Sequence, residues 1–183
     1  MIRAHGDTLT LTVDVAGAAT MMESPAVSDL AAERIARGAR AVRIDLRDCT
    51  TMDSTFSGML LALKRRLERV AGTLTLVSPS TRVAELLQEM GVDDFYAVET
   101  ADRIDGPWGP VVTGRAKSEK LTRVVIEAHD ELAQLPGDAG RTFRTVVDEL
   151  RRRTDDASPR LPDAPESMRT ASFARDPTIM RPD

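Results

Sequence analysis

A strand that leads directly into a helix constrains the fold more than any other part of this chain. Residues 42–47 alternate apolar and polar side chains, which is the period of two expected of a β-strand. Further along, apolar residues recur at three- and four-residue intervals, with charged residues between them. These apolar positions are Phe56, Leu60, Leu63, Leu67 and Val70. The pattern predicts a strand followed by an amphipathic helix, the repeating unit of an α/β fold.

The junction between this strand and this helix holds the candidate functional residues. Asp53, Ser54 and Thr55 fall where the strand has ended and the helix begins, in a segment rich in residues that favour helix caps. The first turn of a helix has unpaired N–H groups and the positive end of the dipole, so a phosphoryl group is favoured there. Ser54 is therefore a candidate phosphorylation site. The alternative is that Asp53 or Ser54 serves only as the helix cap, which is the commoner use of these residues.

Strands and helices alternate through the first hundred residues. We expect further strands at residues 2–4, 8–15, 74–77 and 95–98, and further helices at residues 24–37 and 81–90. Ser24 is the expected cap of the first helix, and the run Ser78-Pro79-Ser80 is expected to cap the second. The alternation predicts an α/β layered domain in which parallel crossovers join the later strands.

The pattern changes after about residue 103. Residues 105–110, D-G-P-W-G-P, have the composition of a linker, and we assign residues 104–117 to it. Trp108 is expected to tuck against the first domain, because a lone tryptophan usually buries itself; the alternative is an exposed interaction handle.

Two amphipathic helices follow, from residue 118 to about 135 and from about 138 to 153. Pro136 and Gly137 separate them, so they form an αα-hairpin. Each helix must bury its apolar face, either on the first domain or on a second copy of the chain, and we favour the second copy. Residues 154–183 are rich in Pro, Asp, Arg, Ser and Thr without periodicity, which predicts a disordered tail.

Charge and motifs argue against several classes of function. The net charge of −4 disfavours nucleic-acid binding as the main task. No phosphate-binding glycine loop is present, and His5 and His129 lack neighbours at metal-ligand spacing, so we predict no cofactor and no metal. We expect both histidines at the surface. No nucleophile-elbow pattern surrounds Ser54 and no histidine is tied to it, so we predict no enzyme.

The expected location is the cytoplasm. The N-terminus lacks the apolar run of a signal peptide, and no apolar stretch is long enough to span a bilayer, so we expect no membrane insertion. A single cysteine, Cys49, excludes an internal disulfide, and we expect it to be a small buried apolar residue.

Residues 42–70, with M-D-S-T at 52–55 and Gly58, resemble the hallmark of the STAS domain, and residues 72–98 resemble the next strand, helix and closing strand of that family. The resemblance covers about residues 1–103. It implies a mixed β-sheet with helices packed on it. The family includes bacterial anti-sigma factor antagonists and the cytoplasmic domains of sulfate transporters. Two positions differ: Phe56 stands where the family often has glycine, and Thr20 where many members have an acidic residue.

The resemblance also implies a function. In antagonists of this type a partner kinase phosphorylates the serine directly after the aspartate, which here is Ser54. The expected protein is non-catalytic: its surface at Asp53, Ser54, Thr55 and Phe56 binds an anti-sigma factor that is also a serine kinase. Phosphorylation releases this partner, and a serine phosphatase restores binding.

Two alternatives stay open at this point. In the first, the protein is a structural STAS-like scaffold subunit of a signalling assembly or a transporter, and it oligomerises, for example as a homodimer, through its C-terminal helices. In the second, which rests on resemblance alone, it binds a nucleotide weakly.

Overall fold

A six-stranded mixed sheet lies at the centre of the computed structural model, which describes residues 1–111 and 118–157, with side chains through residue 152. The strands follow the order β7-β6-β4-β2-β1-β8. Their bounds are Ile2–Gly6 (β1), Thr10–Val15 (β2), Ala41–Asp45 (β4), Thr73–Val77 (β6), Ala97–Glu99 (β7) and Gly109–Pro110 (β8). Strands β2, β4, β6 and β7 run parallel, while β1 is antiparallel to both of its neighbours. The predicted α/β fold with parallel crossovers between the later strands is confirmed.

The strand register builds a continuous apolar row across the sheet. Ile44 in β4 pairs with Val13 in β2 and with Leu76 in β6, and all three side chains are fully buried. Side chains of a strand alternate between its two faces, so the apolar set faces the helices together. This row is the floor on which the helices pack.

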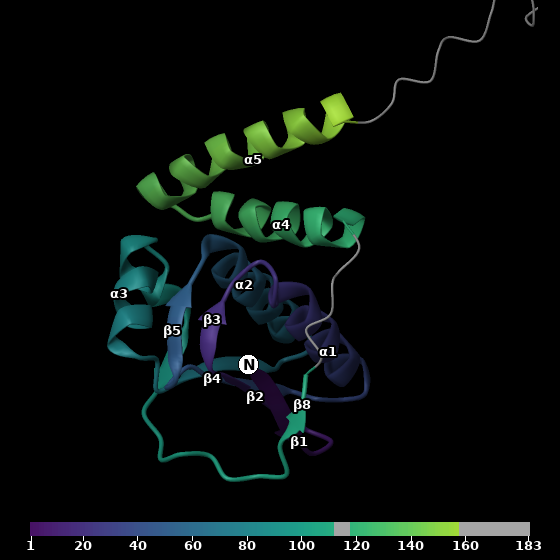
Figure 1. Ribbon diagram of the computed structural model, residues 1–183, viewed down its shortest axis with the longest axis vertical. Coiled ribbons are helices and arrows are strands. Elements are labelled where there is room, and N and C mark those ends of the chain that lie inside the picture. The colour runs from purple at the N-terminus through teal and green to yellow at the C-terminus, as the bar shows by residue number, and fades with distance from the viewer. Residues whose placement is uncertain (112–117, 158–183) are drawn as a thin grey trace, which may run out of the picture.

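Helices α1 (Ser24–Ala36) and α2 (Ser54–Glu68) pack on this floor, and α3 (Thr81–Glu89) lies beside β5 (Cys49–Met52) (Figure 1). Ser80 caps α3 as predicted, accepting a hydrogen bond from Val83 N. The expected cap of α1 is wrong, since Ser24 is already helical and Glu23 holds the cap position. Instead, the Glu23 carboxylate accepts hydrogen bonds from the Thr20 backbone N–H and hydroxyl, which close the turn before the helix.

A second, two-stranded parallel sheet carries the chain from β4 to α2. It pairs β3 (Gly17–Ala19) with β5 (Cys49–Met52), so part of the predicted cap-rich junction is a strand. The pairing ends where Asp53 N donates to Ala19 O. This small sheet holds the start of α2 beside the turn that precedes α1.

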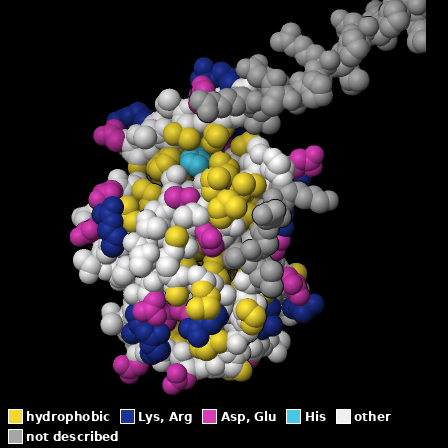
Figure 2. Space-filling view, viewed as in Figure 1, with side chains coloured by type: hydrophobic (Ala, Val, Ile, Leu, Met, Phe, Trp, Pro, Cys, Tyr) yellow, Lys and Arg dark blue, Asp and Glu magenta, His cyan; other side chains and the backbone are white. Residues whose placement is uncertain are grey.

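The C-terminal hairpin comprises α4 (Ser118–Ala133) and α5 (Gly137–Ala157), with α4 between α5 and α2 (Figure 1). The expectation that its apolar faces pack on a second copy is wrong for α4, which packs on α2 and α1 of the same chain. Its residues Val124, Ala128 and Leu132 are buried there. Figure 2 shows hydrophobic side chains gathered over α4, where the hairpin lies on the rest of the molecule. Dimer formation stays a prediction.

Part of the predicted linker is ordered against β1. Gly109 and Pro110 form β8, and Trp108 packs edge-on against the His5 ring at 4.3 Å between centroids. The Arg3 guanidinium lies 5.1 Å from the tryptophan ring centre, so the expected tucking of Trp108 is confirmed. Residues 112–117 of the linker and residues 158–183 of the predicted disordered tail lie outside the described residues, while α5 extends to Ala157, past the expected end of the hairpin at residue 153.

Among the described residues, none of the helices combines the length and the apolar character that crossing a bilayer requires.

The fold makes a prediction about Gly58 in α2, where α4 lies closest. A Cβ atom at this position would lie 2.9 Å from Ala128 Cα and nearer still to the Ala128 carbonyl. Alanine has a higher helix propensity than glycine by about 1 kcal/mol, so the substitution alone should stabilise α2. A loss of protection of the amides against hydrogen exchange would therefore be due to the clash. We expect Gly58→Ala to speed amide hydrogen exchange in α4 while β4 and β6 keep their protection. Gly109→Ala is the matched control, because its Cβ has nothing nearer than 3.7 Å; unchanged exchange in α4 of the Gly58→Ala variant would refute the close packing.

Candidate functional site

The side chain of Asp53 fastens two segments of the site together. One carboxylate oxygen accepts a hydrogen bond from Phe56 N at 2.8 Å, which caps α2, and the other accepts one from Met21 N at 2.8 Å. Asp53 is thus the cap that the sequence allowed for, and it also holds the turn between β3 and α1. Because Asp53 already caps the helix, the hydroxyl of Ser54 is left for another contact.

That contact is with a histidine from the C-terminal hairpin. Ser54 is half-buried, and its Oγ lies 3.1 Å from Nε2 of His129 in α4. The other ring nitrogen, Nδ1, lies 2.8 Å from the Val125 carbonyl. A carbonyl can only accept, so a neutral ring has its proton on Nδ1, and Nε2 accepts the hydrogen bond from the Ser54 hydroxyl.

Two expectations about histidine are therefore wrong. His129 is 6% exposed rather than at the surface, and it is tied to Ser54. A signal for this was present in the sequence: His129 lies four residues after Val125 and three before Leu132, which is helical spacing on the apolar face. What the sequence could not supply was the docking of that face on α2.

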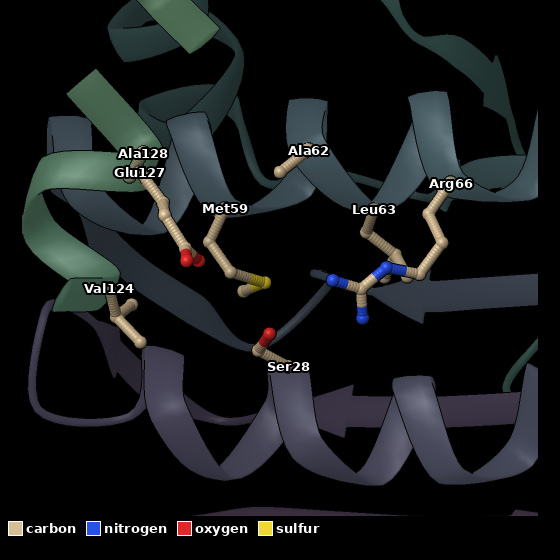
Figure 3. Close-up of a pocket in the computed structure, with 8 residues that line it drawn as sticks. All are labelled: Ser28, Met59, Ala62, Leu63, Arg66, Val124, Glu127 and Ala128. Atoms are coloured by element: carbon tan, nitrogen blue, oxygen red, sulfur yellow. The ribbon is translucent and has the colours of Figure 1, made fainter. Parts of the chain in front are cut away.

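A hydroxyl bonded to a neutral imidazole has the polarity of a nucleophile and its general base. Its surroundings are those of a packed interface. The His129 ring is tilted against the Phe143 ring, with 6.0 Å between centroids. The cavity between α1, α2 and α4 has a volume of about 20 Å³, roughly the room of one water molecule, and is lined by other residues (Figure 3). The Ser54–His129 contact is therefore part of the packed interface between α2 and α4.

Not all of the expected partner-binding residues reach the surface. Asp53 and Ser54 are half-buried, but Thr55 is 4% exposed and Phe56 fully buried in the core. Phe56 opens the inward stripe of α2, so the helical period that identified the helix also places this ring inside. A partner that docks on the folded domain would meet Asp53 and Ser54 and would not meet Phe56.

Two methionines that the sequence analysis missed lie beside the site. Met21 and Met22, in the turn between β3 and α1, are 39% and 48% exposed. The bond from Met21 N to Asp53 places this turn next to the start of α2. Methionine side chains are adaptable and apolar, which suits them to contact with another protein. No periodicity marked them, because they lie in a turn.

A buried tyrosine holds the inner side of α2. The Tyr96 hydroxyl donates a hydrogen bond to the Ser57 carbonyl at 2.8 Å, and burial raises the pKa of Tyr96 to about 12. The phenol therefore stays neutral and keeps donating at physiological pH. This bond joins the segment before β7 to the first turn of α2, at the residue that follows Phe56.

Within residues 1–111 and 118–157, no group of His, Cys, Asp and Glu side chains is arranged to hold a metal ion. Cys49 is buried, as expected.

Removal of the Asp53 carboxylate tests its double role. We expect Asp53→Ala to lower the free energy of unfolding by roughly 1–2 kcal/mol in urea denaturation, since a lost helix cap costs about that much. Asp53→Asn is the matched variant. It keeps one acceptor oxygen, so its free energy of unfolding should lie between those of Asp53→Ala and the unmodified protein. Equal stability of Asp53→Ala and the unmodified protein would show that these two bonds contribute nothing.

The chain was compared with known proteins. A search of curated proteins found no match. Among solved structures, the anti-sigma factor antagonist SpoIIAA in its unphosphorylated form is similar, with a TM-score of 0.51 and 21% identity over 56% of this chain and 89% of that one. The Bacillus cell fate determinant SpoIIAA in the phosphorylated form has a TM-score of 0.48 and 19% identity, over 56% and 92% of the two chains. A family model described as "Mlab, STAS domain" matches residues 2–99, more than half of the chain. This protein belongs to the STAS domain family.

Proposed function

We propose that this protein is a non-catalytic regulator of the anti-sigma factor antagonist type, which switches partners through phosphorylation of Ser54. The observation that carries the proposal is the place of Ser54: it is the first residue of α2, and it follows a cap that Asp53 already provides. Its hydroxyl is thus not needed to close the helix. The similarity of the fold to that of SpoIIAA supports the same class of function.

In this proposal the partner is an anti-sigma factor that is also a serine kinase. Its docking surface on this protein consists of Asp53, Ser54 and the exposed methionines Met21 and Met22. The neutral hydroxyl fits an apolar contact of this kind. The partner in turn releases its sigma factor.

Phosphorylation then ends the contact. The γ-phosphoryl group of a nucleoside triphosphate forms a bond to Ser54 Oγ, the bond to the diphosphate breaks, and the hydroxyl proton passes to the kinase's base. The product carries about −1.5 to −2 charges beside the Asp53 carboxylate, and both repulsion and the cost of desolvation oppose docking. A serine phosphatase, which hydrolyses the phosphate ester, restores the neutral surface.

Substitutions at Ser54 test the switch. We expect Ser54→Ala to bind the partner kinase constitutively and Ser54→Asp to lose at least tenfold in affinity, about 1.4 kcal/mol, because only the second places a charge in the contact. Isothermal titration calorimetry against the partner measures both. Thr51→Asp is the control. Thr51 is exposed and lies three residues before Ser54, so the aspartate adds the same charge outside the contact. Equal affinities of Ser54→Ala and Ser54→Asp would end the proposal.

A second candidate function follows from α5. Its apolar residues Phe143 and Val146 are only half-buried, although α4 already lies against α5. This favours a scaffold role in which a second copy of the chain covers the remaining face of α5. Light scattering on the full chain should then report a dimer that Val146→Asp dissociates. A monomer at all concentrations argues against the scaffold and leaves the switch intact.

A further inference from the structure

We infer that the α4–α5 hairpin covers the Ser54 site within the same chain and must leave α2 before a kinase or a protein partner reaches the hydroxyl. That a kinase and a protein partner bind at this site rests on the proposed function. The cover itself rests on contacts between α2 and α4.

The first contact takes up the hydroxyl. Ser54 Oγ is hydrogen-bonded to His129 Nε2 at 3.1 Å, and His129 is 6% exposed. The imidazole therefore lies directly against Oγ and closes the side of the hydroxyl that faces α4. A phosphate on Ser54 would also need space for three additional oxygen atoms.

The second contact brings the two backbones together. Gly58 lies four residues after Ser54, so both belong to one face of α2. A Cβ atom on Gly58 would collide with the backbone of Ala128, the residue before His129. The same face of α2 thus presents the hydroxyl and accommodates the covering helix.

The third contact continues along this face. Arg65 lies seven residues after Gly58, two helical turns further, and its Nη1 is 2.7 Å from Glu131 Oε2 in α4. Figure 3 shows Glu127 of α4 pointing toward Met59 of α2, beside the cavity of about 20 Å³ that these residues line together with Val124 and Ser28. Three turns of α2 are therefore under α4.

The character of these contacts suits a cover that can leave. One is a hydroxyl–imidazole bond. Another is an ion pair whose side chains are 34% and 22% exposed, although Glu131 Oε2 itself is buried and accepts no hydrogen bond from the described residues. Arg65 Nη1 also donates to Oε1 of Gln134, just after α4. The helix buries Val124, Ala128, His129, Leu132 and Ala133, of which Leu132 is fully buried. The hairpin also lies outside residues 2–99, to which the family match is confined.

A thiol placed at the site measures access without any partner. In the full chain, Ser54→Cys should react slowly with iodoacetamide compared with Thr51→Cys, since residue 51 is exposed. Cys49 is buried and gives the background rate, which the unmodified protein reports. Mass spectrometry assigns each alkylated position.

Charge reversal then opens the cover. Adding Glu131→Arg to Ser54→Cys places a cation against Arg65 and should raise the alkylation rate roughly two- to fivefold, the factor that corresponds to the usual strength of such an ion pair. The swap Arg65→Glu with Glu131→Arg should restore the slow rate. Arg123→Glu, on the exposed side of α4, is the matched control and should change nothing.

The outcomes are decisive in either direction. The cover is supported if alkylation of Ser54→Cys is slow, becomes faster with Glu131→Arg, and is slow again when Arg65→Glu is added. A rate of Ser54→Cys alkylation that is indifferent to the Arg65–Glu131 pair overturns it; the comparison is made between variants that share the same thiol, because a thiol at a helix N-terminus beside His129 is intrinsically reactive. If Glu131→Arg disturbs β4 and β6 in amide hydrogen exchange, Gly58→Ala replaces it as the opening variant, with the same expected rise in rate.

A parallel measurement separates this inference from the proposed function. Phosphate occupancy at Ser54 is compared by mass spectrometry in protein isolated from its own cells, with and without Glu131→Arg. Higher occupancy in the variant supports both ideas. Equal, substantial occupancy overturns the cover and leaves the switch standing, whereas fast alkylation of the opened variant without any phosphate overturns the switch and leaves the cover standing.

Discussion

One carboxylate holds the functional part of this molecule in place. Asp53 accepts hydrogen bonds from Phe56 N in α2 and from Met21 N in the turn before α1, so the start of one helix and the approach to another share a single side chain. Because this carboxylate closes α2, the neighbouring hydroxyl of Ser54 is directed to α4 instead. The sequence left open whether Asp53 or Ser54 caps α2. In the structure the aspartate caps the helix, and the serine contacts another segment.

The elements of the STAS domain were largely predictable because their signals are local. The period-two pattern in residues 42–47 and the apolar stripe from Phe56 to Leu67 are properties of neighbouring residues, and both elements are present. Strand β5 was missed because Cys49–Met52 has no alternation of its own: it is a strand through its pairing with β3, which lies thirty residues earlier in the chain. The same limit explains the cap of α1, where the Thr20–Glu23 bonds depend on the shape of the preceding turn.

The candidate site shows this limit more clearly. Asp53 and Ser54 could be identified from position alone, since a cap-rich segment between a strand and a helix has few other uses. The burial of Phe56 follows from the helical period, yet the same residue was expected to face a partner. His129 lies seventy-five residues from Ser54, and only the packing of α4 on α2 brings them together. The sequence indicates that α4 has an apolar face, but not which surface this face covers.

The missing side chain at Gly58 has a consequence for any protein segment that competes with α4. The backbone of α2 is bare at this point, and Ala128 fills the resulting notch with its own backbone. A helix with a bulky residue at the equivalent position would be held away by a full layer of side chain, and would not reach the serine one turn earlier. A competing helix would therefore need a small residue at this point to approach α2 as closely as α4 does.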